Sequence, residues 1–144
     1  MNVKRFFLAA VVVFIVAEVL EFLIHGVILA STYEALKDLW RPDMESKMWI
    51  YPVIGAIWSL LFVYIFVKGR EGKGLMEGVR FGVVIGLFVG IPMAYGTYAM
   101  IAIPYSLALQ WWIYTLIECI VLGVIAALVY KPLPAPAAGS AASE

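Results

Sequence analysis

Residues 6–30 read FFLAAVVVFIVAEVLEFLIHGVILA, and this stretch decides the class of the protein. A helix needs roughly 20 mostly apolar residues to cross a bilayer, and this run is long enough. Lys4 and Arg5 precede it, as they would precede the apolar part of a secretory signal. The run is longer than a signal needs and holds two glutamates, so we expect an uncleaved membrane-spanning helix.

The composition of the whole chain agrees with a membrane protein. Of its 144 residues, 65% are hydrophobic and 14% are charged, and the mean hydropathy is +0.99. A soluble domain is about half apolar and one-quarter charged. The formal net charge is zero, so the chain offers no basic surface for nucleic acid. Its single cysteine, Cys119, excludes a disulfide within one chain and a cysteine-based metal motif.

Three further apolar segments follow the first, which predicts an all-α integral membrane bundle of four transmembrane helices. We expect these helices in a single domain, residues 1–131, and a lipid bilayer around them. The remaining residues, 132–144, are rich in Pro, Ala and Ser, a composition typical of a disordered tail. The four predicted spans are about 6–30, 49–67, 79–102 and 106–130.

The orientation follows from Lys and Arg, which concentrate on the cytoplasmic side of membrane proteins. With four spans, the side that holds the N-terminus carries seven of these residues and the opposite side three. We therefore expect a multi-pass protein of the cell membrane with the N- and C-termini in the cytoplasm. The larger set comprises Lys4, Arg5, Lys68, Arg70, Lys73, Arg80 and Lys131.

The long loop between the first two predicted spans, residues 31–49, is the outer loop, and it contains a short helical pattern. Ser31 and Glu34 have the spacing of a capping box, and Tyr33, Leu36 and Trp40 form one apolar stripe. We predict an amphipathic helix over 32–40 that lies on the outer membrane surface. An ordinary ordered loop is the alternative.

Small residues recur every four positions in the third span. Such a stripe lets helix backbones approach closely, which is the main source of packing between helices in lipid. The stripe therefore marks a face on which another helix, or a second copy of the chain, rests. Its central members are Gly78, Gly82, Gly86 and Gly90.

Polar residues inside the first span are the best lead to function. Glu18, Glu21 and His25 share one helix face, and Glu21 and His25 are spaced to hydrogen-bond. Glu118 lies near the middle of the fourth span, at a similar depth. Charged groups at that depth are costly, so we expect these four to line a pocket in the centre or outer half of the bundle. Second candidates for this pocket are Tyr95, Tyr98, Tyr114 and Thr115.

Three interpretations of this cluster stay open. Its carboxyl and imidazole groups suit proton-linked transport or binding of a cation or small solute. The same four residues, Glu18, Glu21, His25 and Glu118, could hold a divalent metal, although a di-iron bundle site uses Glu-x-x-His from two helices. They could also act only as structural hydrogen bonds. No nucleophile–base pair or phosphate loop is present, so we expect no enzyme.

The small size and the glycine stripe also suit a different role. The chain could be a non-catalytic accessory or scaffold subunit of a larger membrane complex, or form a homo-oligomer.

Two resemblances bear on these alternatives. The segment FIVAEVLEF, residues 14–22, resembles the first helix of small multidrug resistance transporters, which are four-helix proteins with a membrane-embedded glutamate. The resemblance implies a dimer that couples cation export to protons, and it would assign that role to Glu18. The chain departs from the family in its long outer loop, its further acidic residues and its glycine stripe.

A wider resemblance covers residues 23–42, LIHGVILASTYEALKDLWRP, and 71–92, EGKGLMEGVRFGVVIGLFVGIP. These segments are similar to small bacterial four-helix membrane proteins of unknown function. The resemblance implies the fold and a prokaryotic cytoplasmic membrane, and it supplies no activity.

Overall fold

The computed structural model describes residues 1–131, and the predicted disordered tail lies outside the described residues. Over this part the chain is all-helical, without strands, and four of its helices are long and apolar enough to cross a membrane. This confirms the all-α class and the presence of four helices that are long and apolar enough to be spans. The elements that form them are α1 (Val3–Glu21) with its extension η1 (Phe22–Ile28), α3 (Ile50–Gly69), α4 (Leu75–Met100) and α5 (Tyr105–Val129).

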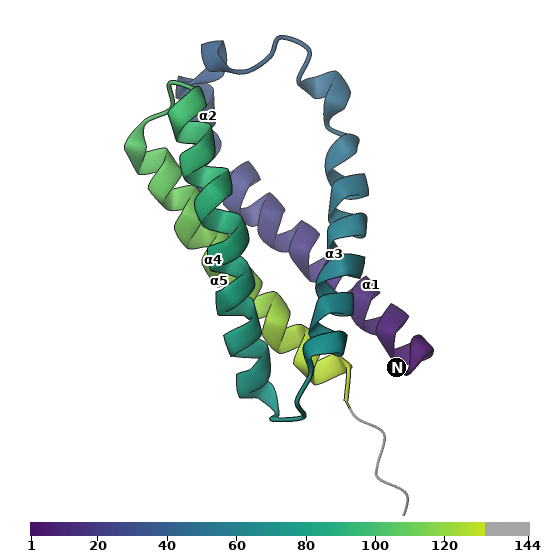
Figure 1. The fold of residues 1–144 in the computed structure, drawn as a ribbon. Coiled ribbons are helices and arrows are strands. Elements are labelled where there is room, and N and C mark those ends of the chain that lie inside the picture. The colour runs from purple at the N-terminus through teal and green to yellow at the C-terminus, as the bar shows by residue number, and fades with distance from the viewer. Residues whose placement is uncertain (132–144) are drawn as a thin grey trace, which may run out of the picture.

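The helices form a closely packed pair and two more loosely attached helices (Figure 1). Helices α4 and α5 lie antiparallel along their length, and α1 crosses the bundle obliquely to contact both α3 and α5. Helix α3 packs on α1 and reaches α4 through aromatic side chains, with ring centroids 4.8 Å apart for Phe62 and Phe81 and 5.3 Å for Phe66 and Phe81. All four helices therefore meet in the half of the bundle that holds the N-terminus.

The glycine stripe of α4 lies against α5. A methyl group added at Gly82 would come within 2.5 Å of the Ile120 Cα atom, and one at Gly86 within 2.9 Å of the Leu116 Cα atom. Gly78, Gly82, Gly86 and Gly90 are all buried. Only a residue without a side chain allows the two backbones to come this close.

The hydrophobic core consists of two clusters. The larger one joins α1, α3 and α5 in the half near the N-terminus and includes Val13, Val63 and Leu122. The smaller one joins η1 and α5 at the other end and includes Leu29 and Leu107. The acidic residues of α1 and α5 occupy the level between these clusters.

The outer loop corrects the prediction of one amphipathic helix over 32–40. Two short pieces, α2 (Ala30–Ala35) and η2 (Lys37–Leu39), are separated by Leu36, whose φ and ψ of −108° and 15° are not helical. The predicted capping box is also absent, because Leu29 is the N-cap and no side chain caps the helix. A further turn, η3 (Glu45–Lys47), precedes α3.

The apolar stripe of this loop does not face lipid as predicted. Tyr33, Leu36 and Trp40 pack against the smaller core cluster, so the loop covers the outer end of the bundle. Burial against protein satisfies the same apolar side chains that would otherwise favour the membrane surface.

Candidate functional site

The first span ends in an unusual helix, and this helix positions His25. From Phe22 to Ile28 the backbone forms a π-helix, with the Leu29 amide donating to the Ile24 carbonyl oxygen at 2.8 Å. Such segments are rare and occur frequently at functional sites. Because α2 follows directly, the chain turns back and brings Tyr33 over His25. The two rings stack with an interplanar angle of 4° and a centroid distance of 5.8 Å.

His25 uses both ring nitrogens. Its Nε2 lies 3.3 Å from Oε2 of Glu21, and its Nδ1 is hydrogen-bonded to the Tyr33 hydroxyl. The Glu21 contact is the i, i+4 pair that the sequence predicts. With the proton on Nε2, His25 donates to Glu21 and accepts from Tyr33.

Tyr33 connects the outer loop to two spans. Its hydroxyl accepts a hydrogen bond from Trp111 Nε1 at 2.8 Å, and its carbonyl oxygen accepts one from Trp40 Nε1 at 3.2 Å. Burial raises the pKa of Tyr33 to about 12, an effect that the Trp111 hydrogen bond opposes and the charge of Glu21 reinforces. The phenol therefore stays protonated across the physiological range and remains a hydrogen-bond donor.

Glu118 joins the cluster from α5. Its carboxyl group lies close enough to those of Glu21 and Glu18 for their charges to interact. An ionised carboxylate can only accept hydrogen bonds, so two carboxyl groups can hydrogen-bond to each other only when one of them carries a proton. Glu21 of α1 and Glu118 of α5 are neighbours and form a carboxyl pair.

Glu18 points toward a different neighbour. A Cβ atom added at Gly55 of α3 would collide with Oε1 of Glu18 and would contact Phe14 at 3.4 Å. Because Gly55 has no side chain, the Glu18 carboxyl group can occupy the space beside it at the α1–α3 crossing.

Two members of the cluster are partly exposed to solvent. The Glu21 side chain is 50% exposed and the His25 side chain 39% exposed in the single chain. The outer half of α3, which would have to close this side, leaves Tyr51, Val53 and Ile54 exposed. Glu21 and His25 therefore lie on an open face in the half of the bundle farther from the N-terminus.

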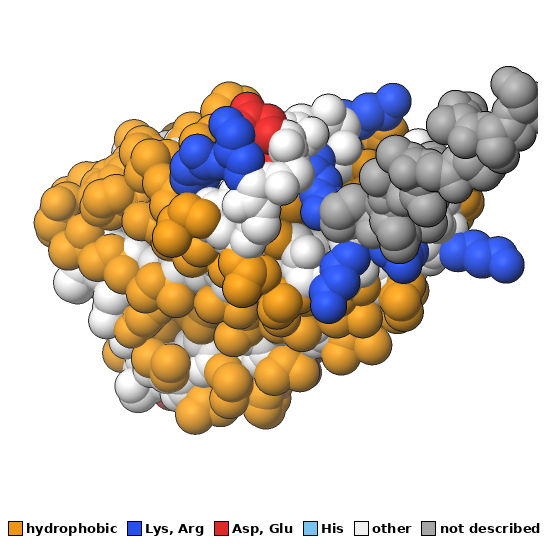
Figure 2. All heavy atoms as spheres, turned by 90° about the horizontal axis from the view of Figure 1, so that it is seen from below, with side chains coloured by type: hydrophobic (Ala, Val, Ile, Leu, Met, Phe, Trp, Pro, Cys, Tyr) orange, Lys and Arg blue, Asp and Glu red, His pale blue; other side chains and the backbone are white. Residues whose placement is uncertain are grey.

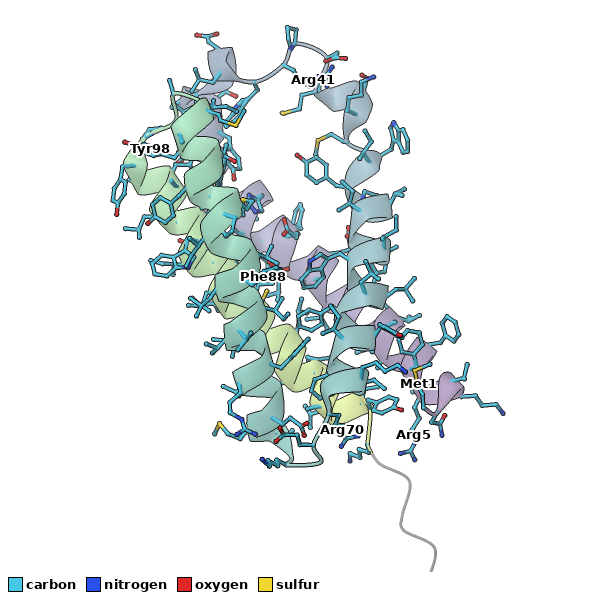
Figure 3. All side chains as sticks on the ribbon, viewed as in Figure 1. Met1, Arg5, Arg41, Arg70, Phe88 and Tyr98 are labelled. Atoms are coloured by element: carbon cyan, nitrogen blue, oxygen red, sulfur yellow. The ribbon has the colours of Figure 1, made fainter. Side chains whose placement is uncertain are left out.

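The second candidates are divided between two places. Tyr114 packs against the smaller core cluster, as Tyr33 and Trp111 do. Thr115 instead faces α4, within 3.3 Å of a methyl group added at Gly90. The rings of Tyr95 and Tyr98 contact Tyr105 in tilted and edge-to-face geometry, at centroid distances of 6.1 and 5.9 Å. Figure 3 shows Tyr98 on the edge of the α4–α5 pair that faces away from α3.

The residues do not converge as a metal site requires. Within residues 1–131, no three or more His, Cys, Asp or Glu side chains are grouped so that they could hold a metal ion. His25 contacts Tyr33 and Glu21, while Glu18 lies against Gly55 of α3. The divalent metal considered from the sequence stays a prediction.

Sequence reasoning missed two members of the site and assigned Tyr33 only to an apolar stripe. Trp111 lies on the side of α5 that carries Glu118, but nothing in its spacing indicates a bond to the outer loop. Gly55 stands in an apolar run, and its contact with Glu18 depends on how α1 crosses α3. Comparison with protein-family models, curated proteins and solved structures finds no match to this chain.

Proposed function

We propose that this chain is a small membrane protein that binds or transports a cation or small solute in exchange for a proton. The supporting observation is the series of contacts from Glu21 through His25 to Tyr33 and Trp111, with the Glu118 carboxyl group beside that of Glu21. Ionisable groups inside spans are costly and mark substrate and proton pathways. The resemblance around Glu18 to proton-coupled cation exporters agrees with this role.

The carboxyl pair provides the coupling. Glu21 and Glu118 can hydrogen-bond to each other only while they share a proton. A cation that approaches both carboxylates favours the ionised pair and releases that proton. By linkage, a proton weakens cation binding by the same factor by which the cation weakens proton binding.

His25 connects this exchange to the outer loop. When the imidazole is neutral, Tyr33 can donate to Nδ1 while it accepts from Trp111. When both ring nitrogens carry protons, the hydrogen bond reverses, and Nδ1 donates to the Tyr33 hydroxyl oxygen, which keeps a second lone pair for Trp111. Protonation of His25 therefore reverses the direction of the hydrogen bond that holds α2 over the cluster. The ionisable groups around this contact are Glu18, Glu21, Glu118 and Tyr51.

Titration of the purified full chain with tetraphenylphosphonium, a lipophilic cation, tests the proposal. If one proton is displaced per cation, the dissociation constant of the cation falls by about tenfold for each unit that the pH rises across the titration of the pair. We expect Glu118→Gln to remove most of this pH dependence, because the amide cannot share a proton in the same way. Glu45→Gln, which changes a carboxylate in the outer loop, is the matched control. Binding that is independent of pH and unchanged in Glu118→Gln and Glu21→Gln contradicts the proposal.

An accessory subunit of a larger complex is the alternative. The glycine stripe suggested this role, but it is covered by α5 and is not free to dock a partner. The apolar side chains on the outer half of α3 remain available for contact with lipid or protein. Purification in a mild detergent separates the two roles, because an accessory subunit co-purifies with a larger partner and a self-sufficient transporter does not.

A further inference from the structure

The end of the bundle that holds the N-terminus is rich in cations. Helix α1 begins there with Lys4 and Arg5, and α3 ends with Lys68. Figure 2 looks onto this end and shows Lys and Arg side chains among apolar ones, with few acidic groups. Arg5 and Arg70 lie at this same end of the molecule (Figure 3).

A hollow of about 330 Å³ opens at this end, between the start of α4 and the end of α5. Its walls are mainly apolar, and two cationic residues, Arg70 and Lys131, border it. The lining residues are Arg70, Gly72, Gly74, Leu75, Ala127, Leu128 and Lys131.

Arg70 is held in place and retains an unused donor. Its Nη1 donates to the Tyr130 carbonyl oxygen at 2.5 Å, and its guanidinium lies 5.6 Å from the centre of the Tyr130 ring. Its Nε atom is buried and has no hydrogen-bond partner in the described part of the chain. The Nη1 bond and the ring contact fix the guanidinium at the rim of the hollow, and an arginine fixed in this way is suited to bind an anion.

The acidic groups nearby are already occupied. Glu71 pairs with Lys73 at 2.5 Å, and the hydrogen bond and charge of Lys73 lower the pKa of Glu71. Buried Glu77 accepts hydrogen bonds from the backbone amides of Glu71 and Lys73. Neither carboxylate is therefore committed to Arg70 or Lys131.

The backbone leaves the hollow open. Gly72 and Gly74 have φ values of 79° and 77°, and a Cβ atom added at either would meet nothing within 4 Å. Helix α4 begins immediately afterwards at Leu75, so the positive end of its dipole also favours a negative charge in the hollow.

We propose that this hollow binds the phosphate group of an anionic ligand between Arg70 and Lys131. Anionic phospholipid is the favoured source, because Leu75, Ala127 and Leu128 offer an apolar wall beside the cations at the end of the spans. Basic hollows between helices at this level are suited to anionic headgroups. The inference is independent of the function proposed for Glu118.

Native mass spectrometry of the full chain, with added phosphatidylglycerol or phosphatidylcholine, tests this site. The test variant is Leu75→Glu, which places a negative charge in the wall of the hollow. The residue is half exposed and lies in the first turn of α4, where an acidic side chain favours the helix, so we expect the variant to fold. Met76→Glu is the matched control, since it makes the same charge change at the neighbouring, exposed position outside the lining.

We expect wild type and Met76→Glu to retain phosphatidylglycerol over phosphatidylcholine, and Leu75→Glu to lose at least about fivefold in that preference. Inorganic phosphate is the second arm. If it displaces the lipid at millimolar concentration, the site takes a free phosphate as well, and if it does not, the site is specific for a lipid. An equal loss in both variants, or no preference in wild type, overturns the proposal.

Discussion

At the scale of single residues, the Tyr33 hydroxyl has the most consequential contacts. It is hydrogen-bonded to His25 and to Trp111, which belong to different spans, while Tyr33 itself belongs to the outer loop. A single deprotonation at this oxygen would place a negative charge beside Glu21. That repulsion and the burial of the ring both favour the neutral phenol.

The first prediction concerns this titration. We expect Tyr33 to ionise at a pH of about 12, above the usual tyrosine value of about 10. The raised pKa means that its contribution to stability is fully present below pH 10 and is lost as the pH rises toward 12. The difference in absorbance at 295 nm between wild type and Tyr33→Phe isolates this one tyrosine. A midpoint near 10 would show that the hydroxyl is not buried against Trp111.

The sequence predicts part of this site and misses the rest for a geometric reason. The face shared by Glu18, Glu21 and His25 follows from a helical rotation of 100° per residue. The π-helix at Phe22–Ile28 breaks that rotation just where His25 lies, and the turn into α2 then returns Tyr33 to the imidazole. Neither the π-helix nor the turn into α2 has a recognisable residue pattern, so the contact of His25 with Tyr33 is visible only in the structure.

At the scale of helices, the sequence is more informative. Each apolar run is bounded by charged or proline-containing segments, so the four spans lie within a few residues of their predicted bounds. The α4 stripe indicates close packing but not the partner. Helix α5 offers Gly123 opposite Gly78, and the pairing of these two glycines is visible only in the structure.

The second prediction follows from this packing. Gly82→Ala places a methyl group against the backbone of Cys119 and Ile120, which cannot move away as a side chain can. We expect the free energy of unfolding to fall by about 1–3 kcal/mol, the usual cost of overpacking. Gly96→Ala is the control, because nothing lies within 4 Å of the added methyl group on the same helix. Alanine there should stabilise the helix by about 0.5–1 kcal/mol.

Unfolding in a graded denaturing detergent, followed by circular dichroism, measures both variants. Equal midpoints for Gly82→Ala and Gly96→Ala would show that α4 and α5 are not held at backbone contact in solution. A fall in both would indicate that α4 tolerates no added side chain on either face.

At the scale of the whole molecule, the charges and the packing are arranged in levels. The end that holds the N-terminus carries Lys and Arg residues and the turn whose backbone amides bind Glu77. The larger core cluster follows it. The carboxyl pair comes next, and the smaller cluster lies beyond it under the outer loop. Of the carboxyl pair, the Glu21 side chain is half exposed and is the member that a solute can reach from solvent. The proposed direction of exchange therefore depends on which end faces the cytoplasm.

The third prediction concerns this orientation. Cations resist transfer across the membrane during insertion, so the end with Arg70 and Lys131 should face the cytoplasm and the loop of Ser46 the outside. Ser46→Cys and Glu71→Cys leave the number of Lys and Arg unchanged, and each is made with buried Cys119 replaced by serine. In right-side-out vesicles, we expect a membrane-impermeant maleimide to label the cysteine at 46 at once and that at 71 only after detergent is added. The reverse pattern would place the carboxyl pair's open face toward the cytoplasm, and the solute would then have to reach Glu118 from inside the cell.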